Sequence, residues 1–151
     1  MAQQKETIST INDLIETLKD GQEGFRQAAE AVENPKLKSL FNEYSLQRSQ
    51  FAGELQSQAI ALGESKPEDS SSAAGAIHRA WIDLKSAIAK HDDRAILAEC
   101  ERGEDSAVKE YEQAMEEENL AAPVREIISR QYAEVQSAHD RIKLFRDTMA
   151  T

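Results

Sequence analysis

The sequence is poor in cysteine, proline, glycine and positive charge. Cys100 is the single cysteine, so no disulfide can form within the chain. Three prolines and six glycines leave few points for sharp turns, which favours helices joined by few connections. The 18 lysines and arginines are outnumbered by 28 aspartates and glutamates, giving a net charge of -10. No apolar run approaches the roughly 18 residues that a membrane span needs.

These deficits exclude several kinds of partner. An acidic chain with an isoelectric point near 4.8 is poorly suited to nucleic acid or to anionic membranes, which favour basic surfaces. Residues 1–6 lack the basic and apolar regions of a signal peptide, so we expect a cytoplasmic protein. At 151 residues with 40% hydrophobic content, the chain is expected to form one domain over residues 1–151.

Four long segments place an apolar residue every three or four positions, the spacing of a helix with one buried stripe. The spacing predicts helices at Ile8–Val32, Leu37–Leu62, about Arg94–Asn119 and Val124–Met149. The proline of Asn34-Pro35 disfavours helical geometry at the residue before it, which separates the first two helices. Leu120 to Pro123 is an equally tight turn between the last two helices.

The second and third long helices are separated by a much longer connection, from Gly63 to Asp93. It contains a polar linker at Glu64–Ser72 and a short helix at about Ala73–Lys90. Two tight helical hairpins joined by one long crossover are the wiring of a ferritin-like four-helix bundle. The fold prediction is therefore an all-α, ferritin-like four-helix bundle with a short fifth helix in the crossover between helices 2 and 3. An uninterrupted coiled coil is disfavoured by the turns and the long connection.

Five short segments carry a resemblance that covers nearly the whole chain. They are Phe25 with Ala28-Ala29-Glu30, then Gln47–Ala52, His78–Trp81, Glu99–Asp105 and His139–Ile142. In these segments the chain resembles a bacterial family known only as a ferritin-like four-helix-bundle domain of unknown function. The resemblance implies the fold, and it implies no reaction because the family has no assigned activity.

The metal motif of ferritin-like di-iron proteins is incomplete in this sequence. Such sites use a glutamate from each of two helices and a Glu-x-x-His pair from each of the other two. No glutamate here is followed three residues later by a histidine, and Gln136 stands three residues before His139. Gln47 and Gln50 stand where the second helix would supply its ligands. Glutamine is a poor anionic ligand for iron, so two parts of the motif are degraded.

Polar side chains interrupt the apolar stripes of all four long helices. They are Gln22, Arg48, Gln58, Glu104 and Gln131. A buried guanidinium would repel a divalent cation but would pair bidentately with a carboxylate. We predict that Arg48 pairs with Glu104 or Glu101, helped by Gln22 and His139. This polar network would fill the volume that metal occupies in ferritin-like proteins.

The favoured functional interpretation is a non-catalytic scaffold or a stress-associated interaction protein that needs no cofactor. The sequence does not decide whether the protein is an enzyme, but it favours a protein without enzymatic activity. One alternative is a divergent di-iron protein that binds iron or another divalent metal through Glu23, Glu101, Glu104 and His139.

A second alternative is a small-molecule-binding bundle with a pocket at His78 and Trp81, under the crossover helix. The more ordinary role for Trp81 is to cap the bundle core. Four stripes can close one bundle within a single chain, so the protein is expected to be a monomer or a homodimer, and an unidentified protein partner is possible. Faces rich in alanine are candidate dimer surfaces, and their residues include Ala28, Ala31, Ala59 and Ala61.

Overall fold

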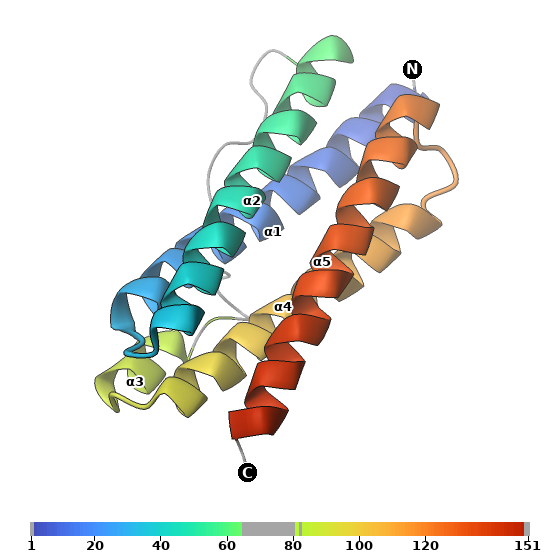
Figure 1. Ribbon diagram of the computed structural model, residues 1–151. Helices are drawn as coiled ribbons and strands as arrows, with labels where there is room; N and C mark the ends of the chain where they lie inside the picture. Colours follow the sequence, from blue (N-terminus) through green and yellow to red (C-terminus); the bar gives the residue numbers. More distant parts are fainter. Residues whose placement is uncertain (1, 65–80, 82, 150–151) are drawn as a thin grey trace.

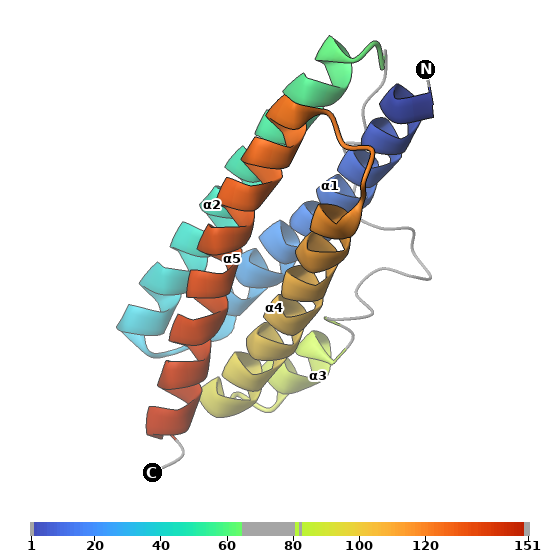
Figure 2. The same cartoon turned by 90° about the vertical axis from the view of Figure 1, so that its right-hand side faces the viewer.

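The computed structural model describes residues 2–64, 81 and 83–149. Its helices are α1 (Ala2–Ala31), α2 (Pro35–Ala61), α3 (Leu84–Ala89), α4 (Asp93–Glu116) and α5 (Ala122–Met149). The four long helices form the predicted bundle of two antiparallel hairpins, with α3 in the crossover between them (Figure 1). α1 packs against both α2 and α4, and α5 packs mainly against α4, so α2 and α4 are diagonally opposite (Figure 2).

Several predicted helix boundaries differ from the structure, and α1 begins at Ala2, well before the predicted Ile8. The third long helix ends at Glu116 and not at Asn119, because side chains bind the backbone that follows. Arg125 donates to the carbonyl oxygen of Met115 at 2.8 Å and to that of Glu117, which satisfies the end of α4. Within the crossover, the described helix covers only Leu84–Ala89 of the predicted short helix. Residues 65–80 and 82 of the predicted linker and helix lie outside the described residues.

Polar contacts fix both ends of the bundle. Asn34 caps α2, and its Oδ1 accepts from the backbone N–H of Lys36 at 2.8 Å. The carboxylate of Asp93, the first residue of α4, accepts from the N–H groups of Glu33 and Asn34 at 2.9 Å each. At the other end, the Oγ1 of Thr7 accepts from the N–H of Ala121 at 3.2 Å. Each helical hairpin is therefore tied to the turn of the other.

The buried apolar residues form two clusters, one in each half of the bundle. The half nearer the α1–α2 turn contains Phe25, Phe41, Tyr44, Trp81, Ile96, Leu97 and Ile142, among others. The half nearer the α4–α5 turn contains Ile11, Leu14, Phe51, Leu55, Tyr111, Ile128 and Val135, among others. Between them, the middle turns of α2 and α4 bury Arg48 and Glu104. The core is therefore divided by a polar layer at mid-height.

Trp81 packs into the first of these clusters between α1 and α4. Its indole lies edge-on to the Phe25 ring, with the ring centroids 5.2 Å apart. A Cβ atom on Gly24 would lie 2.5 Å from Trp81 Cε3, and one on Gly103 would lie closer still to Cε2 and Cζ2 of the same indole. These two glycines are therefore required by the close approach of the tryptophan. The expectation that Trp81 caps the core is confirmed.

Candidate functional site

The centre of the bundle holds an ion pair between Arg48 of α2 and Glu104 of α4. Arg48 Nη2 donates to Glu104 Oε2 at 2.8 Å, and Arg48 Nη1 donates to Glu104 Oε1. The pair is bidentate, with the two side chains 1% and 0% exposed. Both oxygens of the carboxylate are occupied by the guanidinium, so this glutamate is neutralised from within the chain.

Several neighbours stabilise the charge on Arg48. The guanidinium carbon lies 5.4 Å from the centroid of the Phe25 ring, within cation–π range. Its Nε donates to Gln47 Oε1 at 3.2 Å. Burial alone would lower the pKa of Arg48, but the charge and hydrogen bonds of Glu104 offset burial and the pKa is raised. Arg48 therefore stays cationic inside the bundle.

A second buried polar contact, which the sequence analysis missed, lies beside this pair. Tyr111 of α4 donates its hydroxyl to Gln131 Oε1 of α5 at 2.7 Å. Gln131 Nε2 donates to the carbonyl oxygen of Phe51 at 3.3 Å and to Glu54 Oε1 at 3.1 Å, which reaches α2. Burial raises the pKa of Tyr111, so its hydroxyl keeps its proton. The two residues lie at nearly equal distances from the turn at Leu120, a signal that could have predicted the contact.

Three other residues of the predicted network are placed differently. Glu101 pairs with Arg146 of α5 and not with Arg48. His139 lies at the α4–α5 boundary, with its ring nitrogens 3.1 Å from Asp140 Oδ1 and 2.5 Å from Asp105 Oδ1. Gln22 is half-buried, and its buried Oε1 has no hydrogen-bond partner among the described residues. Glu101 and His139 consequently lie outside the central network, because their charged partners are Arg146, Asp105 and Asp140.

The structure also does not bring together the alternative metal ligands. Glu23 is bound by Arg26 on the surface of α1, Glu101 by Arg146 and Glu104 by Arg48. In the described part of the chain, no group of three or more histidine, cysteine or acidic side chains is arranged to hold a metal ion. Each of the three glutamates in the alternative ligand set is therefore paired with a different arginine.

The predicted pocket at His78 and Trp81 lies only partly within the described residues. His78 lies outside the described residues. Trp81 fills the space between Gly24 and Gly103 and so occupies the core instead of lining an open site.

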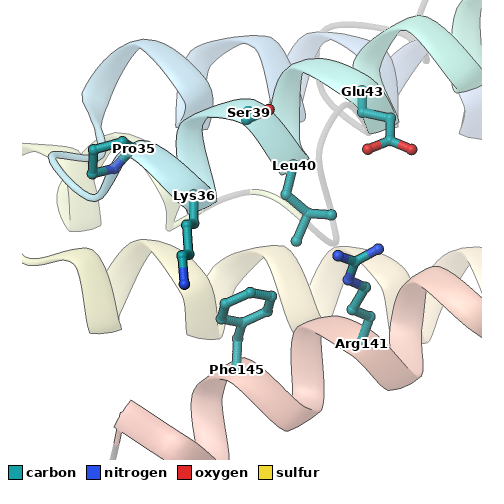
Figure 3. A pocket seen from close by; sticks show the side chains of 7 residues that line it. All are labelled: Pro35, Lys36, Ser39, Leu40, Glu43, Arg141 and Phe145. Atoms are coloured by element: carbon teal, nitrogen blue, oxygen red, sulfur yellow. The ribbon is translucent and has the colours of Figure 1, made fainter.

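A groove is present on another side of the molecule, between α2 and α5 (Figure 3). It has a volume of about 380 Å³, and its lining residues are Pro35, Lys36, Ser39, Leu40, Glu43, Arg141 and Phe145. The Phe145 ring lies between Lys36 and Arg141, with Leu40 facing it from α2 (Figure 3). Neither Lys36 nor Arg141 forms an ion pair with a described carboxylate. The groove therefore combines the apolar side chains of Leu40 and Phe145 with two cations and the carboxylate of Glu43.

None of the described helices combines the length and apolarity needed to cross a membrane.

The fold has a clear counterpart among solved structures. A structure of a Mycobacterium smegmatis Dps1 mutant matches with a TM-score of 0.74, covering 96% of this chain and 97% of the other at 14% identity. This likeness, together with the two crossover-linked hairpins, defines a ferritin-like four-helix bundle. The family model described as a domain of unknown function (DUF2383) matches residues 6–117, and the chain belongs to this family. No curated protein matched the sequence.

Proposed function

We propose that this protein is a cytoplasmic, non-catalytic ferritin-like bundle that serves as a scaffold or interaction protein in a stress or housekeeping setting. In this proposal the mid-bundle position is held by a polar network and needs no metal. The observation that carries it is the bidentate pairing of Arg48 with Glu104 at the centre of the core.

The chemistry of this pair supports a structural role for the bundle centre. A dication entering there would have to displace a buried guanidinium from Glu104 and leave that guanidinium without a counter-charge, which is strongly unfavourable. The nearest polar contact, between Tyr111 and Gln131, offers a neutral hydroxyl and a neutral amide. Neither group supplies the anionic oxygen that divalent iron prefers.

Metal titration tests the proposal directly. The full-length protein is incubated aerobically with ferrous iron, desalted and analysed for bound metal. We expect less than about 0.1 iron per chain, whereas ferritin-like di-iron sites bind about two ions through shared carboxylates. About two ions per chain, lost in Glu104→Gln but retained in Glu112→Gln, would overturn the proposal. Glu112 is the matched control because it is an exposed acid on the same helix.

A second candidate function, small-molecule binding, is favoured by the groove between α2 and α5. Its two cations outnumber the single carboxylate of Glu43, so with the apolar side chains of Leu40 and Phe145 they fit a ligand with a carboxylate and a short apolar body. Octanoate is a suitable probe. Its binding can be measured through changes in the amide chemical shifts of the protein in NMR spectra.

Binding in the groove predicts saturable shifts at Leu40 and Phe145 with a dissociation constant below about 1 mM. Arg141→Gln should weaken binding, while Lys143→Gln should not, because Lys143 is exposed on the same helix but does not line the groove. An absence of saturable shifts, or equal weakening in both variants, would exclude this function for the groove.

A further inference from the structure

The side of α2 that faces away from the bundle carries a continuous stripe without charge. Its members follow the three- and four-residue spacing of one helical face: Ser39, Asn42, Leu46, Gln50, Gly53, Ser57 and Ile60. We refer to these seven residues as the outward stripe. On one flank, Ser45 donates to the carbonyl oxygen of Gln22 in α1, and on the other, Glu54 pairs with Arg130 of α5. The stripe lies between these flanks and is exposed or half-buried throughout.

The outward stripe differs from the exposed sides of the other long helices. Charged residues make up 30% of the chain. On α4, the exposed residues include Arg102, Asp105, Lys109, Glu112 and Glu116, and on α5 they include Glu126, Arg130, Glu134, Asp140 and Lys143. The outward stripe instead presents Leu46 at 60% exposure and Ile60 at 58%. This uncharged helix face, on a chain with a net charge of -10, is therefore a candidate contact surface.

Gly53 provides an independent indication. A glycine inside a helix costs about 1 kcal/mol relative to alanine, so an internal glycine needs a reason. Gly24 and Gly103 are explained by the indole of Trp81, but a Cβ on Gly53 would meet no atom within 4 Å. Nothing within the described chain therefore requires Gly53 to lack a side chain. Close approach of a backbone from outside the molecule would give such a reason.

The positions along the stripe are self-complementary. Leu46 lies seven residues before Gly53, and Ile60 lies seven residues after it. If two copies of α2 cross antiparallel with a two-fold axis at Gly53, the leucine of each copy meets the isoleucine of the other. The glycines then allow the two backbones to approach at the crossing point.

We propose that the protein forms a homodimer in which two α2 helices pack antiparallel through their outward stripes, centred on Gly53. This proposal names a second copy of the chain as the partner and in that respect rests on the proposed interaction role. Two chains of charge -10 repel each other, and the outward stripe lets them touch without placing like charges in contact. One helix pair buries less area than a standard interface, so we expect the association to be weak. Salt screens the repulsion and strengthens the dimer.

Sedimentation equilibrium of the full chain, from about 10 to 500 µM, measures the association. We expect a monomer–dimer equilibrium for the wild type that shifts toward dimer at higher salt. Leu46→Glu and Ile60→Glu should each weaken association at least tenfold. Leu144→Glu is the matched control, because Leu144 on α5 is 66% exposed but lies outside the stripe, and it should leave association unchanged. A monomeric wild type over the whole range, or equal loss in all three variants, would overturn the interface.

Gly53 allows a second test that does not depend on added charge. Gly53→Ala should stabilise the monomer to denaturant but weaken the dimer, since the new methyl groups meet at the crossing point. Gly53→Cys should form an intermolecular disulfide on mild oxidation, because the two-fold axis brings the two cysteines together. Ser129→Cys, exposed on α5, is the control that should not cross-link. Equal cross-linking of both variants would contradict the proposed packing.

These tests separate the interface from the proposed function. A monomeric protein that binds no iron would remove the dimer and leave the non-catalytic bundle standing. A dimer that binds two ions per chain would reject the metal-free, non-catalytic bundle and leave the proposed interface standing.

Discussion

Arg48 and Glu104 join the two helices that lie diagonally opposite in the bundle. Because α2 and α4 share few direct backbone contacts, this pair is the link between them across the core. It lies between two apolar clusters, one in each half of the molecule. A buried pair of this kind fixes how the two hairpins align, since any sliding of one hairpin would separate the charges in a medium of low dielectric constant.

Removing one member of this pair should destabilise the protein strongly. In Arg48→Met, the carboxylate of Glu104 stays buried without its partner, and we expect a loss of about 3 to 5 kcal/mol in the free energy of unfolding. Chemical denaturation followed by circular dichroism measures this loss. An unchanged midpoint in Arg48→Met would contradict a structural role for the pair.

The double variant Arg48→Met with Glu104→Met distinguishes loss of the pair from loss of packing. Replacing a buried ion pair by apolar side chains of similar volume is often neutral or stabilising. We therefore expect the double variant to recover most of the stability that each single variant loses. A double variant with the summed loss of the two single variants would show that the charges are not coupled.

The glycines next to Trp81 should be intolerant of even one methyl group. In Gly103→Ala the new Cβ would overlap the indole, and overpacking of this kind typically costs about 1 to 3 kcal/mol. Gly24→Ala should behave similarly. Thermal unfolding of each variant checks the prediction.

Gly53→Ala is the internal control for this pair of variants. Its Cβ would meet no atom within 4 Å, so the substitution should instead raise the free energy of unfolding of the monomer by about 1 kcal/mol.

Combining Gly103→Ala with Trp81→Leu should relieve the overlap between the new methyl group and the indole, although the smaller leucine side chain leaves a cavity of its own. If all three alanine variants had the same effect, the packing of Trp81 between α1 and α4 would be excluded.

His139 should make stability depend on pH near neutrality. Burial lowers its pKa, but hydrogen bonds to Asp140 and Asp105 more than offset burial, and the pKa is raised in the folded protein. The stabilisation is therefore fully present below the unfolded value of about 6.5 and is lost as the pH rises through the folded pKa. Because Asp105 and Asp140 are exposed, the contribution should stay below about 1 kcal/mol.

The free energy of unfolding of the wild type should therefore fall as the pH rises from about 5 to about 8, the range in which histidine ordinarily titrates. His139→Gln should lack this decrease. Asp105→Asn, which removes one of the two acceptors, should flatten the same part of the profile. A profile of His139→Gln parallel to that of the wild type would refute the assignment.

Cys100 should be chemically inert in the folded protein. Its side chain is fully buried, and burial, followed by the charges of Glu104 and Glu99, raises the pKa of the thiol well above its usual range. We expect a thiol reagent such as DTNB to label it only in denaturant, with a labelling rate under native conditions that follows unfolding. Rapid stoichiometric labelling of the native protein would contradict this prediction.

The four long helices and their wiring could be predicted from the sequence because their cause is local. Apolar spacing determines which face of each helix is buried, and the short turns at Pro35 and Pro123 force antiparallel neighbours. Small boundary errors arose where distant side chains bind the backbone. Asn119 lies outside α4 because Arg125 and Thr7 satisfy the carbonyl groups at that end.

The surface residues were harder to predict. The sequence predicts Ala28 and Ala59 on a dimer surface, but both are fully buried, since both buried stripes are wider than the strict three- and four-residue spacing suggests. Leu46 and Ile60 belong to an exposed stripe with the same spacing as a buried one, so periodicity alone cannot assign either face to the core.

The sequence alone determined that this protein is a ferritin-like bundle, that no glutamate is followed three residues later by a histidine, and that a charged residue lies on the buried side of α2. Those properties depend on residue type and spacing along one chain segment. Only the tertiary structure decided that Arg48 meets Glu104 and not Glu101, that His139 faces Asp105, and that two glycines admit Trp81. Partner choice depends on the rotation and depth of each helix relative to the others, which the packing of the whole core sets.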